Sequence, residues 1–334
     1  MSGDGDSLLK VTDLAVTFDS QEGVVRAVGG VSFAIEQGET VGLVGESGCG
    51  KSISALAILG LVRMMSNSSI SGTVEFMGRD LLSLPESQVR SVRGRDMAMI
   101  FQDPVTSLNP VLSIERQMTE GIENHLGVSH SEAVKRSIEL LETVGIPKAT
   151  ERIRDYPHQF SGGMRQRVMI AIALSCNPKL LLADEPTTAL DVTIQAQILR
   201  LMKQLSRDYG AAIMLITHDL GVVAGMTERI LVMYAGRIVE AAPAKQLFAE
   251  PHHPYTIGLL RSVPRLDEPR KLTLQSIEGV PPDLAHLPPG CAFAPRCLLR
   301  TEECRKQNQE LVPTTPGRLS ACFHSDQLVK TAVA

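Results

Sequence analysis

The sequence predicts an α/β fold. Short apolar runs typical of buried strands recur along the chain, and several are followed by segments with helical periodicity. Between one such strand, residues 40–44, and the next predicted helix, residues 53–59, the chain reads Gly45-Glu46-Ser47-Gly48-Cys49-Gly50-Lys51-Ser52. This stretch fits the phosphate-binding pattern of Gly, four residues, Gly-Lys-Ser/Thr. Strand, loop and helix together predict a nucleotide-binding core.

Each part of this loop has a chemical role. A glycine-rich turn lets backbone N–H groups close around an anion without Cβ clashes. The helix that follows adds unpaired N–H donors and the positive end of its dipole. Lys51 can then reach the β- and γ-phosphates of a nucleotide, and the Ser52 hydroxyl can bind Mg²⁺.

Composition narrows the class of protein. With 334 residues the chain is long enough for two domains. A net charge of −4 argues against a general nucleic-acid binder. No apolar run approaches the roughly 20 residues that span a bilayer, and residues 1–6 lack the pattern of a signal peptide. We therefore expect the chain to fold in the cytoplasm and to reach a membrane only through a partner.

The N-terminal part predicts a small antiparallel sheet. Its turns are expected at residues 21–23 and 29–30, and its strand-like runs are residues 8–11, 14–18, 24–28 and 31–35. Residues 72–78 predict a further edge hairpin after the first helix. Phe18 is a candidate to stack on adenine beside the phosphate loop, with a place in the core as the alternative.

A helical subdomain is expected inside the sheet domain. A buried strand at residues 97–101 ends at Gln102, and residues 103–175 show helical patterns without strands. One helix, apolar from Val134 to Val144, is predicted to follow a Ser131 cap. The segment closes with Ser161-Gly162-Gly163 before a helix at 165–175, and this second turn can also bind an anion.

Polar side chains follow two further buried strands. Asp184-Glu185 comes directly after residues 180–183, and His218-Asp219 after residues 213–217. Ligands of open parallel sheets bind outside the carboxyl ends of the strands. We therefore predict that Lys51, Gln102, Asp184-Glu185 and His218 converge on one phosphate. Asp184 is placed to hold the Mg²⁺ shell, and Glu185 to polarise an attacking water.

The C-terminal region changes in composition. A strand pair at residues 230–240 and a short helix at 244–250 are expected, and from about Pro264 prolines are frequent and periodic runs few. This tail contains four of the six cysteines, Cys291, Cys297, Cys304 and Cys322, in the spacing C-x₅-C-x₆-C-x₁₇-C.

These four thiols leave three alternatives open, namely zinc, an iron–sulfur cluster and free thiols. Zinc sites usually contain C-x₂₋₄-C pairs, which the tail lacks. His324 is interpreted as a surface histidine rather than a substitute ligand. Cys49 and Cys176 are expected to be plain small residues.

Six segments, taken in order, resemble the ATPase subunits of ABC transporters. They are similar to the Walker A, Q-loop, signature, Walker B, D-loop and H-loop elements of that family: Gly45–Ser52, Gln102, Ser161-Gly162-Gly163, Leu180–Glu185, Ala189-Leu190-Asp191 and His218. The resemblance covers roughly residues 8–265. Residues 101–110 and 184–193, His253-Pro254-Tyr255-Thr256 and the cysteine tail narrow it to the oligopeptide, dipeptide and nickel importers, and most of all to the first (D-type) ATPase of a dipeptide permease.

The resemblance implies a domain plan and a set of site residues. A nucleotide-binding domain would span residues 1–263, with its helical subdomain at about 103–175, and an extension would span 264–334. ATP would be bound by Phe18, Gly45, Glu46, Ser47, Gly48, Cys49, Gly50, Lys51, Ser52 and Gln102. Ser52, Gln102 and Asp184 would hold Mg²⁺, and Glu185 and His218 would act on the γ-phosphate.

The resemblance also implies partners. Two ATPase subunits would dimerise head to tail, so that Ser161, Gly162, Gly163, Met164 and Arg165 complete the partner's ATP site and Asp191 lies at the seam. Met164 departs from the Gln frequent in the family, and residues 19–23 are an insertion that affects the match of Phe18. Two transmembrane permease subunits and a periplasmic or extracellular substrate-binding protein would complete the complex, with this subunit on the cytoplasmic face of the inner membrane.

The resemblance favours a [4Fe–4S] cluster at the four tail cysteines, because related dipeptide-permease ATPases carry one in this region. The function that follows is ATP hydrolysis that powers import of di- or oligopeptides. Import of nickel or glutathione is the alternative within the family. A soluble ABC ATPase acting on DNA or ribosomes would usually show two cassettes or a long coiled-coil insertion, and neither is present. A P-loop GTPase or kinase is a further alternative, but no Asn-Lys-x-Asp guanine motif is visible and the Ser161-Gly162-Gly163 helix start would be unexplained.

Overall fold

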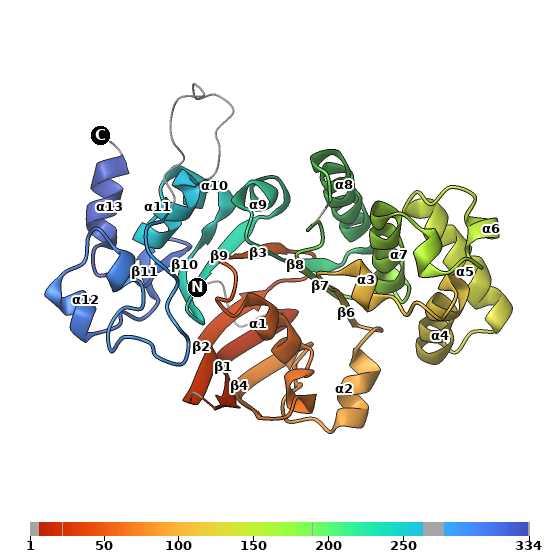
Figure 1. Ribbon diagram of the computed structural model, residues 1–334, viewed down its shortest axis with the longest axis horizontal. Helices are drawn as coiled ribbons and strands as arrows, with labels where there is room; N and C mark the ends of the chain where they lie inside the picture. Colours follow the sequence, from red (N-terminus) through yellow and green to blue (C-terminus); the bar gives the residue numbers. More distant parts are fainter. Residues whose placement is uncertain (1–6, 22, 189, 263–276, 333–334) are drawn as a thin grey trace. The chain divides into compact units, whose positions relative to one another are not determined.

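The computed structural model describes residues 7–21, 23–188, 190–262 and 277–332. Within these residues the chain forms two compact units, which are described separately (Figure 1). The first comprises residues 7–8, 35–39 and 83–215, and the second comprises residues 9–34, 40–82 and 216–332.

The first unit combines parallel strands with a group of helices. Its elements are α2 (Glu86–Val92), β6 (Met97–Ile100), α3 (Pro104–Ser107), α4 (Ile114–Leu126), α5 (His130–Thr143), α6 (Ala149–Arg152), the 3-10 turn η2 (Pro157–Gln159), α7 (Gly162–Leu174), β7 (Leu180–Asp184), α8 (Val192–Tyr209) and most of β8 (Ala212–Thr217). The strand order is β8-β7-β6, and β6 and β7 run parallel. Every residue of β7 and β8 is buried, as expected for strands covered on both faces.

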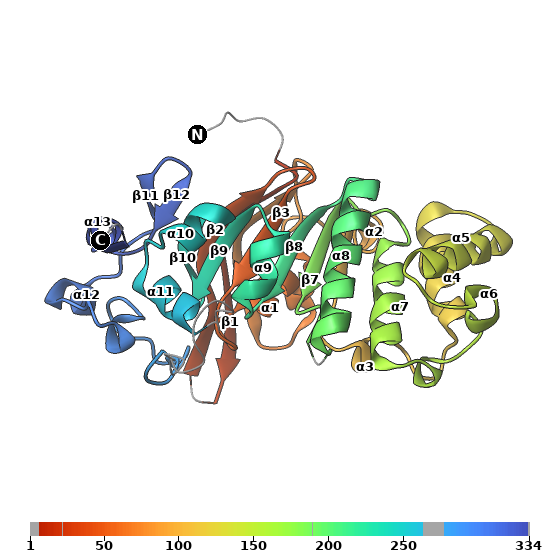
Figure 2. The same cartoon turned by 90° about the horizontal axis from the view of Figure 1, so that it is seen from above.

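The helical group confirms the helical pattern predicted for residues 103–175. Helices α4, α5, α6 and α7 lie together in both views (Figures 1 and 2). The cap of α5 was predicted wrongly, because Ser129, not Ser131, begins the helix. Ser129 forms a capping box with Glu132, which satisfies backbone N–H groups at both positions.

The second unit contains an antiparallel sheet and the strand that leads to the phosphate-binding loop. Its elements are β1 (Leu9–Ser20), β2 (Gly23–Ile35), β3 (Thr40–Val44), α1 (Lys51–Ile58), η1 (Val62–Met64), β4 (Ser68–Phe76), β5 (Arg79–Asp80), α9 (Leu220–Met226), β9 (Arg229–Tyr234), β10 (Arg237–Pro243), α10 (Ala244–Ala249), α11 (Pro254–Arg261), η3 (Ala294–Arg296), α12 (Glu302–Lys306), β11 (Val312–Thr315), β12 (Arg318–Ser320) and α13 (Ser325–Ala332).

The strands of this unit form two sheet regions. The antiparallel sheet runs β2-β1-β4-β5, and the other strands run β11-β12-β10-β9-β3, with β3 and β9 parallel. The predicted turn at Gly29-Gly30 is wrong, since both residues lie inside β2. The runs 8–11 and 14–18 join into β1 through a bulge at Asp13, whose φ is +49°.

The C-terminal extension has more regular structure than its composition predicts. Strand β12 pairs antiparallel with β10, and β11 pairs with β12. Arg318 of β12 is buried beside Glu240 of β10, 3.6 Å between nitrogen and oxygen, and also pairs with Glu250. A buried ion pair and two strand pairings therefore fix the extension to the rest of the second unit.

Candidate functional site

The predicted phosphate-binding loop follows β3, and its last two residues, Lys51 and Ser52, begin α1, two residues earlier than the predicted helix start. Gly45 and Gly50 tolerate no side chain, because an added Cβ would come within 2.2 Å of the carbonyl oxygen of Met233 or Ala27, respectively. Gly48 and Gly50 also have positive φ angles, +78° and +104°, which favour glycine. Local backbone sterics therefore explain all three glycines of the motif.

Lys51 folds back over the loop. Its ammonium nitrogen donates to the carbonyl oxygens of Gly45, at 2.8 Å, and Glu46, at 2.9 Å, and lies 3.8 Å from Cys49 Sγ. Lys51 is only 5% exposed. Burial raises the pKa of the Cys49 thiol, so this thiol stays neutral beside the ammonium group.

Glu46 is held at two points by residues far away in the sequence. Its backbone N–H donates to the Tyr255 hydroxyl at 2.8 Å. Its two carboxylate oxygens accept from the two terminal nitrogens of Arg296, at 2.6 and 2.9 Å. Sequence reasoning missed both contacts, because separations of 209 and 250 residues leave no local pattern.

Glu185 lies one residue beyond β7 in the first unit. Its Oε2 accepts from Gln102 Nε2 and from Thr188 Oγ1, each at 2.9 Å. Its φ is +45°, a conformation that is uncommon for a residue with a side chain and that concentrates at functional sites. The structure thus brings together two of the predicted residues, Gln102 and Glu185, and adds Thr188.

The other predicted strand-end residues lie where the sequence places them. Asp184 ends β7 and is 5% exposed. His218 directly follows β8 and is exposed, and Asp219 caps α9 by accepting from the Gly221 N–H at 2.8 Å. The convergence of Lys51, Gln102, Asp184-Glu185 and His218 on one phosphate stays a prediction.

The second predicted anion turn begins α7. Ser161 is its N-cap and accepts from the Met164 N–H, and Ser161 and Gly162 are both exposed. Arg165 donates to the Phe160 carbonyl at 3.0 Å. Asp191 is the exposed N-cap of α8 and accepts from the Ile194 N–H at 2.9 Å. Both capped helix starts therefore lie at the surface of the first unit.

Phe18 lies inside β1, opposite Ser68 of β4, and is half-buried. It thus lies in the paired strand that contains the predicted strand-like run 14–18. No contact of Phe18 connects it with the phosphate-binding loop among the interactions of the described residues, and its adenine-stacking role stays a prediction.

The four tail cysteines line one small cavity of about 20 Å³, together with His324. Burial raises the pKa of Cys291, Cys297 and Cys322, the last to about 12, and neighbouring thiols raise each further. Backbone N–H groups two residues further on point at two of the sulfurs, from Leu299 to Cys297 Sγ and from His324 to Cys322 Sγ, both at 3.4 Å.

His324 differs from the predicted surface histidine. It is half-buried, and its Nε2 lies 3.6 Å from Cys304 Sγ. Nevertheless, in the part of the chain that the structure describes, no group of three or more His, Cys, Asp or Glu side chains is arranged to hold a metal ion. The thiols share a cavity without forming a finished metal site.

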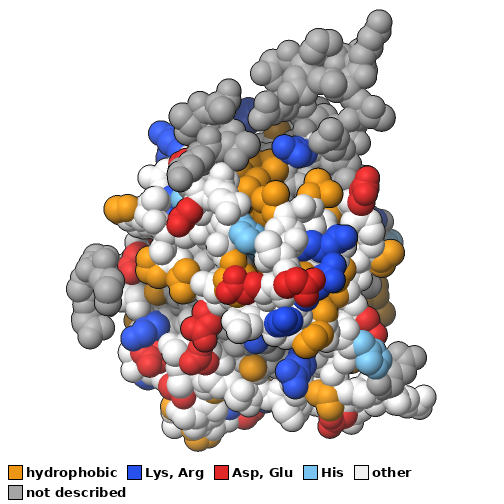
Figure 3. Space-filling view, turned by 90° about the vertical axis from the view of Figure 1, so that its left-hand side faces the viewer, with side chains coloured by type: hydrophobic (Ala, Val, Ile, Leu, Met, Phe, Trp, Pro, Cys, Tyr) orange, Lys and Arg blue, Asp and Glu red, His pale blue; other side chains and the backbone are white. Residues whose placement is uncertain are grey.

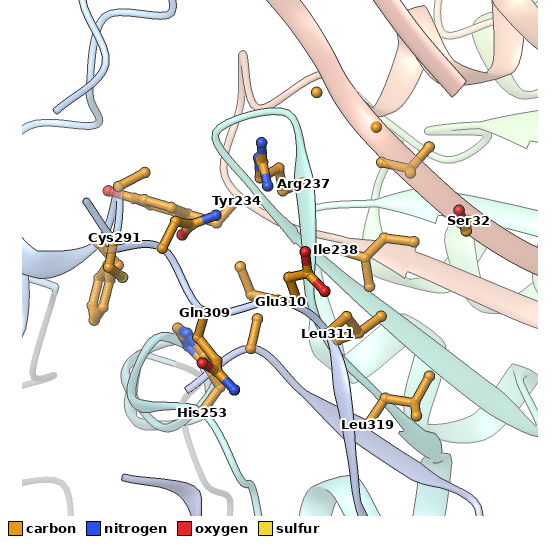
Figure 4. A pocket seen from close by; sticks show the side chains of 18 of the residues that line it. Ser32, Tyr234, Arg237, Ile238, His253, Cys291, Gln309, Glu310, Leu311 and Leu319 are labelled. Carbon is orange, nitrogen blue, oxygen red and sulfur yellow. The ribbon is translucent and has the colours of Figure 1, made fainter. Parts of the chain in front are cut away.

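A second, larger cavity of the same unit has a volume of about 560 Å³ (Figure 4). Ser32 of β2, Tyr234, Arg237 and Ile238 of the β9–β10 hairpin, and Cys291 and Glu310 of the extension line it. None of residues 45–52 contributes to its wall, so this cavity is separate from the phosphate-binding loop.

The surface seen from the side of the extension mixes acidic, basic and apolar side chains (Figure 3). No single charge sign dominates this face, which differs from the basic stripe of a nucleic-acid binder. Among the described helices, none has both the length and the apolar character needed to cross a membrane.

Two family models match the chain. The ABC transporter model matches residues 28–188, and the model of the oligopeptide/dipeptide transporter C-terminal region matches residues 239–304. The second match includes Tyr255, Arg296 and three of the four tail cysteines.

Relatives match over nearly the full length. The oligopeptide transport ATP-binding protein OppD of Salmonella typhimurium is 52% identical over 95% of this chain and 93% of its own. The dipeptide transport ATP-binding protein DppD of Bacillus subtilis is 48% identical over 98% of each chain. Among solved structures, the dimeric structure of MJ0796, a bacterial ABC transporter cassette, has a TM-score of 0.63 at 28% identity and covers 71% of this chain and 98% of that chain.

Proposed function

The chain belongs to the ABC transporter family, as an ATP-binding subunit of the oligopeptide/dipeptide importers, and we propose how its residues divide the work of ATP-driven peptide import. The predicted family and the predicted fold class, an ABC cassette with an antiparallel β subdomain and a helical subdomain, are confirmed. The chain is an ABC ATPase that drives peptide transport. The residue roles below are our proposal.

ATP phosphates bind at the loop Gly45–Ser52, including Glu46, Ser47, Gly48, Cys49 and Gly50. This assignment is supported by the steric need for glycine at Gly45 and Gly50 and by the position of Lys51 over the loop. The Lys51 ammonium group donates hydrogen bonds to two loop carbonyls, and phosphate oxygens would replace these carbonyls as acceptors. Phe18 stacks on adenine in this proposal.

Glu185 is the group that polarises the attacking water, and this assignment carries the proposal. Its support is the observed cluster of Glu185, Gln102 and Thr188 around one carboxylate oxygen, in a strained backbone conformation at a strand end. His218 contacts the γ-phosphate. Ser52, Gln102 and Asp184 offer the oxygen ligands that Mg²⁺ prefers, and the ion would neutralise phosphate charge.

A second ATPase subunit completes each ATP site. Ser161, Gly162, Gly163, Met164 and Arg165 would bind the nucleotide held by the partner, and Asp191 would lie at the seam. This arrangement is supported by the exposure of Ser161 and Gly162 at the start of α7, where backbone N–H groups attract an anion. The relative MJ0796 is itself described as dimeric.

The wider assembly follows from the family. Two transmembrane permease subunits and a substrate-binding protein outside the cytoplasmic membrane complete the importer, with this subunit bound peripherally at the cytoplasmic face. The cassette spans residues 1–263, with the helical subdomain at about 103–175 receiving the permease, and residues 264–334 form the extension. The oligopeptide and dipeptide names of the relatives favour peptides over nickel or glutathione.

The extension binds a [4Fe–4S] cluster through Cys291, Cys297, Cys304 and Cys322. Its support is the shared cavity and the N–H donors to two of the sulfurs, a feature that tunes cluster potentials. A cavity of about 20 Å³ holds little more than one water molecule, so the thiols must move apart to admit a cluster.

Substitution of Glu185 tests the proposed hydrolysis. In the assembled importer, Glu185→Gln should lower ATP turnover by about 100-fold or more while MgATP binding is retained, because only the proton acceptor is lost. The exposed Glu302→Gln is the matched control and should behave as wild type. Normal turnover by Glu185→Gln would contradict the assignment.

A further inference from the structure

An ion pair between Arg296 and Glu46 joins the C-terminal extension to the phosphate-binding loop. Arg296 presents both terminal nitrogens to both carboxylate oxygens of Glu46, the fork geometry that gives the strongest Arg–carboxylate contacts. The Arg296 side chain is 5% exposed and that of Glu46 is 25% exposed. This ion pair is therefore largely removed from water, unlike a surface pair.

Arg296 is also held by groups other than Glu46. Its Nε donates to the Glu278 carbonyl at 3.0 Å, and a terminal nitrogen donates to the Ile277 carbonyl at 3.2 Å. The other terminal nitrogen lies 3.4 Å from the Tyr234 hydroxyl. Two backbone carbonyls and a tyrosine thus orient the guanidinium group before it meets Glu46.

An aromatic cluster fixes the segment that carries Arg296. Phe293 packs edge-on against Tyr234, with ring centroids 5.2 Å apart, and lies 5.4 Å from Tyr255. Tyr255 is fully buried and accepts the hydrogen bond of the Glu46 N–H. The side chain and the backbone of Glu46 therefore both contact residues of one packed group formed by β9, α11 and the extension.

We infer that Arg296 is a positioning residue for ATP binding, which holds the Glu46 carboxylate away from Lys51 and neutralises its charge. Lys51 Nζ already contacts the Glu46 carbonyl at 2.9 Å, so a released carboxylate of the same residue would compete with the phosphates for that ammonium group. It would also place an uncompensated negative charge in the loop that binds a polyanion. This inference rests on the proposed role of Gly45–Ser52 as the phosphate-binding loop.

The position of Arg296 gives the extension a role in the nucleotide site. Arg296 is the last residue of η3, and this turn lies between Cys291 and Cys297. The segment that contains the proposed cluster ligands thus also contains Arg296, whose guanidinium group positions the Glu46 carboxylate.

The experiment measures MgATP affinity of the full-length chain by titration with a fluorescent ATP analogue and by competition with ATP. Arg296→Gln leaves Glu46 charged and should weaken affinity by about 10-fold, because the half-buried carboxylate loses its cation and then competes with the phosphates for Lys51. The double variant Arg296→Gln with Glu46→Gln removes the stranded charge and should recover affinity to within about 3-fold of wild type. Arg305→Ala, which removes an exposed arginine of the same extension, is the control and should bind ATP normally.

The rescue separates a positioning role from a merely structural one. Wild-type affinity in Arg296→Gln, or an affinity in the double variant no better than in Arg296→Gln, would overturn the inference. Arg296→Lys keeps the charge but loses the fork, and it should lie between wild type and Arg296→Gln. It provides the same comparison if the glutamine variant does not fold.

Lys51→Ala tests the underlying assignment of the loop in the same assay. Loss of ATP binding in Lys51→Ala with unchanged binding in Arg296→Gln would overturn only the inference about Arg296. Unchanged binding in Lys51→Ala would overturn the proposed phosphate-binding loop, and with it the premise of the inference.

Discussion

Glu185 combines an unusual backbone conformation with two hydrogen bonds to one carboxylate oxygen. Gln102 and Thr188 both donate to Oε2. A positive φ at a non-glycine residue costs free energy, and the surrounding contacts must compensate for it. The geometry is what a general base needs, because the donors fix the direction in which the carboxylate faces.

Thr188 should therefore tune turnover without being essential. Thr188→Val removes the hydroxyl donor at nearly constant volume, and we expect kcat for ATP to fall by about 5- to 10-fold with an unchanged KM. Steady-state ATPase assays of the assembled importer measure both constants. Thr193→Val, an exposed threonine in the first turn of α8, is the control. An unchanged kcat in Thr188→Val would contradict a positioning role for this hydroxyl.

At the scale of elements, helix α11 depends on a neutral histidine. His253 is the N-cap, and its Nδ1 accepts the Tyr255 N–H at 3.1 Å. Burial lowers the pKa of His253 to about 3. A protonated imidazole could not accept this bond, so the cap and the pKa shift both require the neutral form.

The shift predicts a loss of stability in acid. Between about pH 6.5 and 3 the unfolded chain binds a proton at His253 that the folded chain does not, so the free energy of unfolding falls as pH falls through this window. From pH 7 to 5 this amounts to about 2 kcal/mol. His253→Asn keeps a capping oxygen and should lose about that much less over the same range in denaturant titrations. The exposed His286→Asn should match wild type, and equal pH profiles for wild type and His253→Asn would refute the prediction.

The extension is fixed by the buried pair of Arg318 on β12 and Glu240 on β10. Burial raises the pKa of Glu240, and Arg318 opposes that effect. Arg318→Met leaves Glu240 without its cation and should lower the free energy of unfolding by about 3 kcal/mol. Arg305→Met is the exposed control. A destabilisation as small as that of the control in chemical denaturation would contradict this account of the β10–β12 contact.

Sequence patterns predicted elements best where local signals agree. The strand at residues 40–44, the loop and the helix after it coincide with β3 and α1, because a buried apolar run, glycines and a helix start follow one another. Gly29-Gly30 misled the prediction, since glycines mark turns more often than strand interiors. Strands β11 and β12 were not predicted, because both are short and depend on pairing with distant segments or with each other: β12 pairs with β10, and β11 pairs with β12.

The candidate site shows the same division. Gln102, Asp184 and Glu185 were found because each stands at the end of an apolar strand. The contact of Arg296 with Glu46 could not be found in this way, since it arises only when distant segments of the second unit pack together. His253-Pro254-Tyr255-Thr256 was noticed as part of the resemblance, but its role in capping α11 and binding Glu46 appears only in the structure.

At the scale of the whole molecule, the extension adds four clustered thiols to the cassette. Anaerobic purification should yield about four iron and four sulfide per chain if the proposed cluster is present. Cys304→Ser should lower the iron content markedly, whereas Cys176→Ser, a buried thiol outside the extension, should not. One zinc per chain, or a folded and active protein without metal, would contradict the cluster.

The central claim is that this chain converts ATP hydrolysis into peptide import. The most direct test is uptake of a labelled dipeptide into proteoliposomes that contain the complete importer, with ATP supplied on the side of this subunit. We predict uptake that requires ATP and is lost in Glu185→Gln while assembly of the complex is preserved. Uptake that persists in Glu185→Gln, or ATP hydrolysis that drives no uptake of any peptide tested, would contradict the account.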